Sequence, residues 1–65
     1  MSTDDEILTT REVAALLKKP VQTIYKWASY GTGPPYYKIG RENRYKRSEV
    51  MAWFDSHQDE VSRGI

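Results

Sequence analysis

Two short apolar stripes, separated by only three residues, restrict the fold of this chain more than any other feature. The first stripe has Val13, Leu16 and Leu17 at the i, i+3, i+4 spacing of an amphipathic helix. The second continues the same period and comprises Val21, Ile24, Trp27 and Ala28. The linker Lys18-Lys19-Pro20 requires a tight turn, because proline lacks an amide donor and is tolerated only in a first helical turn. Two short helices joined in this way predict a helix-turn-helix, with the second as its recognition helix.

The sequence also predicts where the first helix starts. Thr9 and Glu12 form a capping box, in which the Thr9 hydroxyl accepts from the Glu12 N–H and the Glu12 carboxylate accepts from the Thr9 N–H. Residues 1–6 are polar and acidic without periodicity, and we expect them to be a disordered lead. Ile7 and Leu8 form either a very short strand or an apolar staple.

After the second helix, a run from Gly31 to Pro35 breaks helical structure. Residues 36–39 and 44–46 favour strands around a hairpin loop at 40–43. A third helix should start near residues 47–49, and the chain from residue 58 should be frayed. The fold class is therefore α+β: a winged helix-turn-helix over residues 7–57, with three short helices and a two-stranded β-hairpin wing.

The aromatic residues are expected mainly in the core. The aromatic residues at helical spacing are Trp27, Trp53 and Phe54, and the aliphatic Ile24 is expected in the core with them. His57 ends the stripe of the third helix and is expected to be a half-buried ring. Of Tyr36 and Tyr37, one should point inward and one outward, because alternate strand residues face opposite sides; an outward tyrosine could stack on an unpaired base.

Charge is strongly segregated although the net charge is only +1. Between residues 18 and 47, eight basic residues stand against a single acid, Glu42, whereas the flanks hold eight acids and two basic residues. A basic middle between acidic ends is typical of a surface that binds a polyanion.

Catalytic and metal chemistry have little support. The chain has no cysteine and one histidine, and the acids at positions 4–6 lie in a segment without fixed geometry. Gly31 and Gly33 precede two prolines rather than a helix start, unlike a dinucleotide-binding loop. No apolar run is long enough to span a membrane, and the first residues do not show the basic-then-apolar layout expected of a signal peptide. We expect a cytoplasmic non-enzyme with no cofactor, metal, small-molecule ligand or membrane partner.

The amino end of the second helix offers side chains suited to base edges in the major groove. Gln22 can pair with adenine, Lys26 with guanine, and the Thr23 methyl group can contact a thymine methyl. Tyr25 can donate its hydroxyl to a phosphate.

The hairpin adds a second basic element. Arg41 and Arg44 flank a loop that also carries Asn43, and arginine fits a narrow, electronegative minor groove. Lys38, Lys46 and Arg47 lie on or beside the same hairpin. Helix and wing together predict a surface for double-stranded DNA.

Six short motifs, taken in their order along the chain, resemble those of a known family. They are Leu8 to Ala14, Thr23 to Trp27, Gly33-Pro34-Pro35, Lys38 to Arg41, Arg44-Tyr45 and Val50-x-x-Trp53. Over about residues 7–57 the chain resembles the small winged helix-turn-helix excisionases of phages and integrative elements, relatives of MerR-type DNA-binding domains. In one departure, Pro20 and Val21 stand where the family has a Ser or Thr cap and a polar residue. The departure shifts the expected base contacts to Gln22, Thr23 and Lys26.

The resemblance implies an architectural protein that binds adjacent attachment-region sites, bends the DNA and favours prophage excision over integration by a partner integrase. Cooperative self-association on DNA and location on the bacterial host nucleoid are expected with it. Two alternatives use the same sequence features. One is a small AlpA-like or MerR-like transcriptional regulator. The other is a protein-interaction module whose contact patch is formed by Tyr36, Tyr37 and Tyr45.

Overall fold

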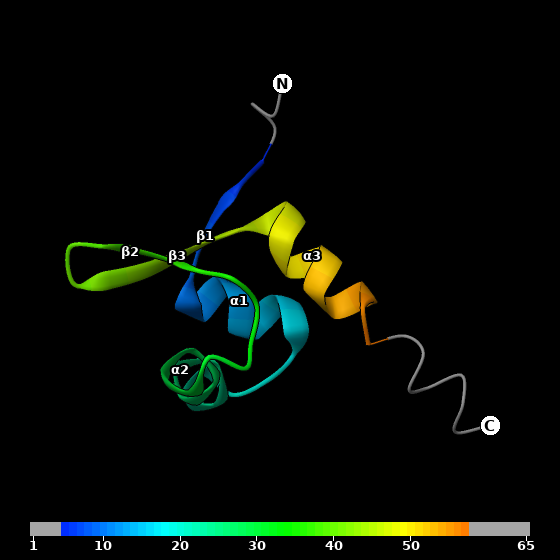
Figure 1. Cartoon of the computed structure of the whole chain (residues 1–65), viewed down its shortest axis with the longest axis horizontal. Coiled ribbons are helices and arrows are strands. Elements are labelled where there is room, and N and C mark those ends of the chain that lie inside the picture. Colours follow the sequence, from blue (N-terminus) through cyan, green and yellow to red (C-terminus); the bar gives the residue numbers. More distant parts are fainter. Residues whose placement is uncertain (1–4, 58–65) are drawn as a thin grey trace.

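The computed structural model describes residues 5–57 and contains three helices and a three-stranded sheet in this part of the chain (Figure 1). The elements are β1 (Ile7–Thr9), α1 (Thr10–Leu17), α2 (Val21–Tyr30), β2 (Tyr37–Ile39), β3 (Glu42–Lys46) and α3 (Arg47–Asp55). The predicted α+β winged helix-turn-helix is confirmed, with α1 and α2 as the helix pair and the β2–β3 hairpin as the wing. Residues 1–4 of the expected lead and the expected frayed tail lie outside the described residues.

The predicted capping box starts α1. The Glu12 N–H donates to the Thr9 hydroxyl at 3.1 Å, and the Thr9 N–H donates to the Glu12 carboxylate at 2.8 Å. Lys18 ends the helix in a left-handed conformation, with φ of 58°. Pro20 then occupies the N-cap of α2 without a side-chain cap hydrogen bond, and its carbonyl accepts from the Thr23 N–H at 3.0 Å. The tight turn between the helices is therefore present as predicted.

The sheet has one strand more than the predicted two-stranded wing. Its order is β1-β3-β2, with both pairs antiparallel. Ile7 and Leu8 thus belong to a strand, the first of the two alternatives, and Leu8 lies opposite Tyr45. A two-stranded hairpin is marginal in water, and β1 joins the wing to the helical core through the buried Leu8 side chain.

The hairpin loop is shorter than the predicted residues 40–43. Ile39 pairs with Glu42, so only Gly40 and Arg41 form the turn, and Glu42 and Asn43 belong to β3. Gly40 has φ of +64°, whereas Arg41 does not have a positive φ, as in a type II′ turn with glycine at its first central position. The predicted first strand also starts one residue late, at Tyr37 rather than Tyr36.

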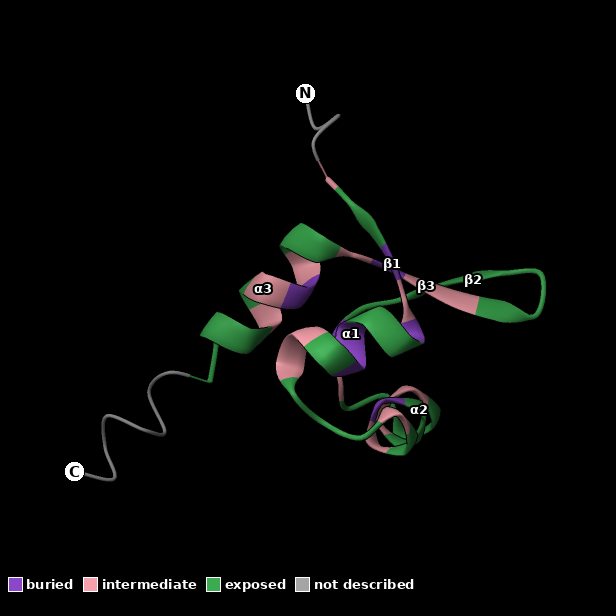
Figure 2. Cartoon of the chain, turned by 180° about the vertical axis from the view of Figure 1, so that it is seen from behind, coloured by how far each residue is buried: buried purple, intermediate pink, exposed green. Residues whose placement is uncertain are grey.

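The core lies where α1, α2, α3 and the middle strand meet, as the buried segments in Figure 2 show. Its buried apolar side chains are Leu8, Val13, Ala14, Ile24, Tyr45 and Val50. Tyr45 is only 1% exposed, and burial, followed by the nearby phenols of Tyr36 and Tyr25, raises the pKa of its hydroxyl. A surface patch that includes Tyr45 is therefore ruled out, which removes the tyrosine contact patch proposed for a protein-interaction module.

Several aromatic residues lie nearer the surface than predicted. Trp27 and Trp53 are half-buried, but Phe54 is 52% exposed and His57 is exposed. Both come after Val50, the residue through which α3 covers the core. The imidazole of His57 packs instead on the Trp53 ring, with 4.5 Å between centroids.

Tyr36 and Tyr37 point to opposite sides of the wing, one inward and one outward as predicted, although both side chains remain partly exposed. The Tyr36 ring lies 5.9 Å from that of Tyr45. Tyr37 donates its hydroxyl to the Glu49 carboxylate at 3.0 Å.

Asp5 and Glu6, placed by the sequence in a disordered lead, are part of the folded unit. The Arg47 N–H donates to the Glu6 carbonyl at 2.9 Å, which joins this segment to the start of α3. Within residues 5–57, no helix has both the length and the apolar character needed to cross a bilayer.

Candidate nucleic-acid interface

A hollow of about 470 Å³ lies between the wing, the start of α1 and the side of α2. Its lining residues are Thr9, Thr10, Arg11, Tyr25, Lys38, Arg41, Glu42, Asn43 and Arg44. Four of these are cations and one is an acid. The hollow therefore joins the predicted recognition helix, through Tyr25, to the basic wing on a common side of the molecule.

The pleat of the sheet explains why the side chains of Lys38 and Asn43 reach this hollow. Lys38 lies directly opposite Asn43, and Asn43 is two residues from Tyr45 on the same strand. These three side chains share one sheet face, because alternate strand residues project to the same side. Since Tyr45 is buried in the core, this is the face turned toward the helices, and Lys38 and Asn43 border the space beside α2. Arg41 lies at the exposed turn beyond them.

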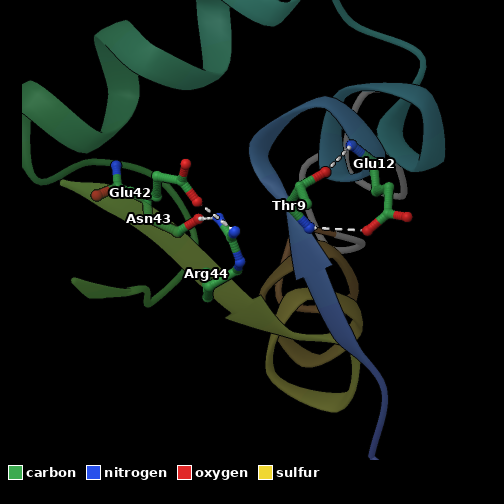
Figure 3. A network of polar contacts seen from close by, with 5 residues as sticks. All are labelled: Thr9, Glu12, Glu42, Asn43 and Arg44. Carbon is green, nitrogen blue, oxygen red and sulfur yellow. Dashed lines mark hydrogen bonds and ion pairs between the residues drawn. The ribbon is translucent and has the colours of Figure 1, made fainter. Parts of the chain in front are cut away.

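The Arg44 side chain interacts with two neighbours on its own strand, Glu42 and Asn43 (Figure 3). Its guanidinium donates to the Asn43 carbonyl at 3.0 Å and forms an ion pair with the Glu42 carboxylate. The Arg44 side chain is 33% exposed. Glu42 thus offsets part of the positive charge that Arg44 brings to the hollow.

The exposed face of α2 continues from this hollow. Gln22, Tyr25 and Lys26 are all exposed, and Gln22 is separated from the other two by three and four residues, so they lie on adjacent parts of the helix surface. Thr23 differs. It lies two residues from Tyr25, on the opposite flank of a helix with 3.6 residues per turn, and it is half-buried.

Lys46 and Arg47 are not brought into the hollow. The Lys46 ammonium lies 5.3 Å above the Tyr37 ring, on the outer face of the sheet. Arg47 pairs with Glu6, with Nε 3.8 Å from the carboxylate. The structure therefore joins Tyr25, Lys38, Arg41, Asn43 and Arg44 in one hollow, and it places Lys46 and Arg47 elsewhere.

Arg11 and Thr10 line the hollow but were not predicted as site residues. Arg11 falls in the otherwise acidic flank of the sequence, so its charge was assigned to the flank. Its position in the first turn of the first helix indicates a DNA contact, because that helix crosses the DNA backbone in helix-turn-helix complexes. In the part of the chain that the structure describes, no cluster of three or more His, Cys, Asp or Glu side chains could hold a metal ion.

A recognition helix and a basic wing on either side of one hollow define a winged helix-turn-helix DNA-binding domain. The family model described as "Helix-turn-helix domain" matches residues 7–58. The chain belongs to this family of small excisionase-like DNA-binding domains, and the resemblance found from its motifs is confirmed. Neither the curated proteins nor the solved structures gave a significant match.

Proposed function

We propose that this protein is an excisionase: a sequence-specific architectural protein that binds adjacent sites in an attachment region, bends the DNA and promotes integrase-mediated excision over integration. The observation that carries the proposal is the hollow in which Tyr25 of α2 faces Lys38 and Arg41 of the wing. One duplex can contact both elements, which is what an architectural protein requires.

In the proposed complex, α2 lies in the major groove. Gln22 and Lys26 are exposed on the face next to Tyr25 and contact base edges. Thr23 contributes a methyl contact from the flank of the same helix. The type II′ turn carries Arg41 toward the neighbouring minor groove, where an arginine favours a narrow groove and a curved duplex.

The phosphate backbone between the two grooves passes along the hollow. Lys38, Tyr25 and Asn43 donate to phosphate oxygens from the wing and α2, and Arg11 does so from the first turn of α1. Arg44 joins them when it leaves Glu42. Lys46 and Arg47 add long-range attraction from outside the hollow rather than direct contacts there.

The experiment is a recombination assay with purified integrase, attachment-site DNA and the protein. We expect the excision-to-integration ratio to rise when the protein is added, and circular permutation gel shifts to show a bent duplex. Several protomers should bind adjacent sites cooperatively, because a domain this small makes few contacts. An unchanged ratio, together with reporter regulation in cells without integrase, would identify a transcriptional regulator instead.

A further inference from the structure

The protein has a second hollow on the side away from the proposed DNA surface, of about 350 Å³. It is lined by Leu17, Lys19, Trp27, Thr32, Trp53, Phe54 and His57. None of these residues lines the hollow beside the wing. Trp27 and Tyr25 are two residues apart on α2 and therefore point to nearly opposite sides of this helix. A duplex bound across α2 and the wing would leave this second hollow open.

The floor of this hollow is a connected aromatic surface. The rings of Trp27 and Trp53 lie 5.2 Å apart, and the His57 ring continues the series from Trp53. Phe54 is half-exposed beside them, and Tyr30, three residues after Trp27 on the same flank of α2, is 70% exposed. Large aromatic side chains left in contact with water at one place are typical of a protein-binding surface.

The charge of the lining residues points to the kind of partner. Lys19 is exposed at the rim and His57 is the other titratable residue, and no carboxylate of residues 5–57 lines the hollow. Phosphate groups of DNA do not suit an apolar floor with one lysine. An apolar side chain carried on a negatively charged segment fits both the floor and the rim.

We propose that this aromatic hollow is a docking site for an acidic amphipathic helix of a partner protein, with the apolar face of the helix on Trp27, Trp53 and Phe54 and a carboxylate near Lys19. The site operates independently of DNA. It gives a DNA-bound copy the means to hold a second protein, and its test needs no duplex.

The test uses two synthetic peptides with the same leucines at helical spacing, one with glutamates and one with lysines at the remaining positions. Both tryptophans of the chain, Trp27 and Trp53, line the hollow, so intrinsic fluorescence of the full-length protein reports its occupancy. We expect the acidic peptide to change the emission saturably and the basic peptide to bind at least about tenfold more weakly. Lys19→Glu should reverse this preference.

Phe54→Ala should lower the affinity for the acidic peptide by about tenfold, as expected for an aromatic anchor. The exposed Phe54 allows this variant to fold, which circular dichroism verifies. Ile39→Ala, a similar loss of an exposed apolar side chain on the wing, is the matched control and should leave binding unchanged. Equal affinity for both peptides, no binding of either, or unchanged binding by Phe54→Ala would overturn the proposal.

Two other occupants are distinguished by the same variants. A concentration-dependent dimer in sedimentation equilibrium that Phe54→Ala abolishes would assign the hollow to a second copy of the chain. Tighter peptide binding after Asp59→Asn and Glu60→Gln would assign it to carboxylates of the chain itself. Either result would overturn the assignment to a partner protein.

Discussion

The carboxylate of Asp5 caps the helix that starts 42 residues later, at Arg47, by accepting two hydrogen bonds from Ser48. The Ser48 backbone N–H donates at 3.0 Å and its hydroxyl at 2.8 Å. Lys46, the N-cap residue of α3, makes no side-chain cap hydrogen bond, so Asp5 supplies from a distance what the local sequence lacks. The acidic segment therefore belongs to the fold and closes the sheet against α3.

Asp5→Ala should lower the melting temperature at neutral pH, because α3 loses its cap. The hydrogen bonds from Ser48, backbone first and hydroxyl second, with a smaller effect of Lys46, hold the pKa of Asp5 below its usual 3.8. A carboxyl whose pKa is lower in the folded state stabilises fully above its unfolded pKa, and this stabilisation is lost as pH falls through the folded pKa. The difference between wild type and variant should therefore shrink below pH 3.8.

Glu6→Ala is the control for this pH dependence. The Glu6 carboxylate lies 3.8 Å from Arg47 Nε with both side chains exposed, and such surface pairs contribute little to stability. Thermal denaturation of both variants across the acidic range compares the two carboxylates directly. If the melting temperature falls as much for Glu6→Ala as for Asp5→Ala, the loss of a negative charge, and not the loss of the cap, explains the lower stability.

The parts of the fold that were predicted correctly depend on neighbours in the sequence. The capping box of Thr9 and Glu12 spans three residues, and the spacing of Val13 and Ile24 within their helices defines the buried faces. By contrast, β1 is three residues long and becomes a strand only through Tyr45 and its neighbours, 37 positions away. The Asp5 cap also depends on residues distant in the sequence, and no local pattern predicts that Asp5 binds the start of α3.

The candidate site also has a part that local sequence predicts and a part that depends on strand pairing. Helical periodicity predicts that Gln22 and Lys26 lie on an exposed helix face with Tyr25 on its flank, and all three are exposed in the structure. The wing residues were found by charge alone, and charge cannot distinguish the two faces of a strand. The sequence therefore does not distinguish Lys38 from Lys46 as a DNA contact. In the structure, the β2–β3 pairing turns Lys38 toward α2 and places Lys46 above the Tyr37 ring.

Gly33→Ala should destabilise the protein, because a methyl group at this position has no room. An added Cβ would lie 2.8 Å from the Trp27 Cβ, closer than any ordinary contact. Overpacking of this kind costs about 1–3 kcal/mol of the free energy of unfolding. Urea denaturation measures the loss. Thr32→Ala, at the exposed preceding residue, should change stability by less than about 0.5 kcal/mol, and equal losses would show that the loop rather than the contact is sensitive.

Gln22→Ala should reduce sequence discrimination and leave general affinity intact. A lost bidentate contact to adenine costs roughly 1–3 kcal/mol at the cognate site and little on random DNA. Gel-shift titrations on both duplexes measure the difference. If the variant loses the same free energy on each, Gln22 contacts the backbone and not a base.

Arg41→Ala should weaken binding to all duplexes and reduce the log-log salt slope by about one, because one positive charge at the electronegative minor groove is lost. Arg47→Ala is the comparison, since it removes the same charge outside the hollow, where Arg47 pairs with Glu6. Its effect on the slope should be smaller. A larger effect for Arg47 would shift the DNA surface to the start of α3.

Glu42→Gln should strengthen binding to every duplex, because Glu42 is the one acid of residues 5–57 that lines the hollow and it holds the Arg44 guanidinium. Removing its charge frees Arg44 for phosphate, so the salt slope should become steeper. Glu49→Gln makes the same change in net charge outside the hollow, beside Tyr37, and should have a smaller effect. A double-mutant cycle separates release of Arg44 from general electrostatics. Arg44→Ala should cost little affinity in the wild type and more in the Glu42→Gln background, and equal costs in both would show that Glu42 does not restrain Arg44.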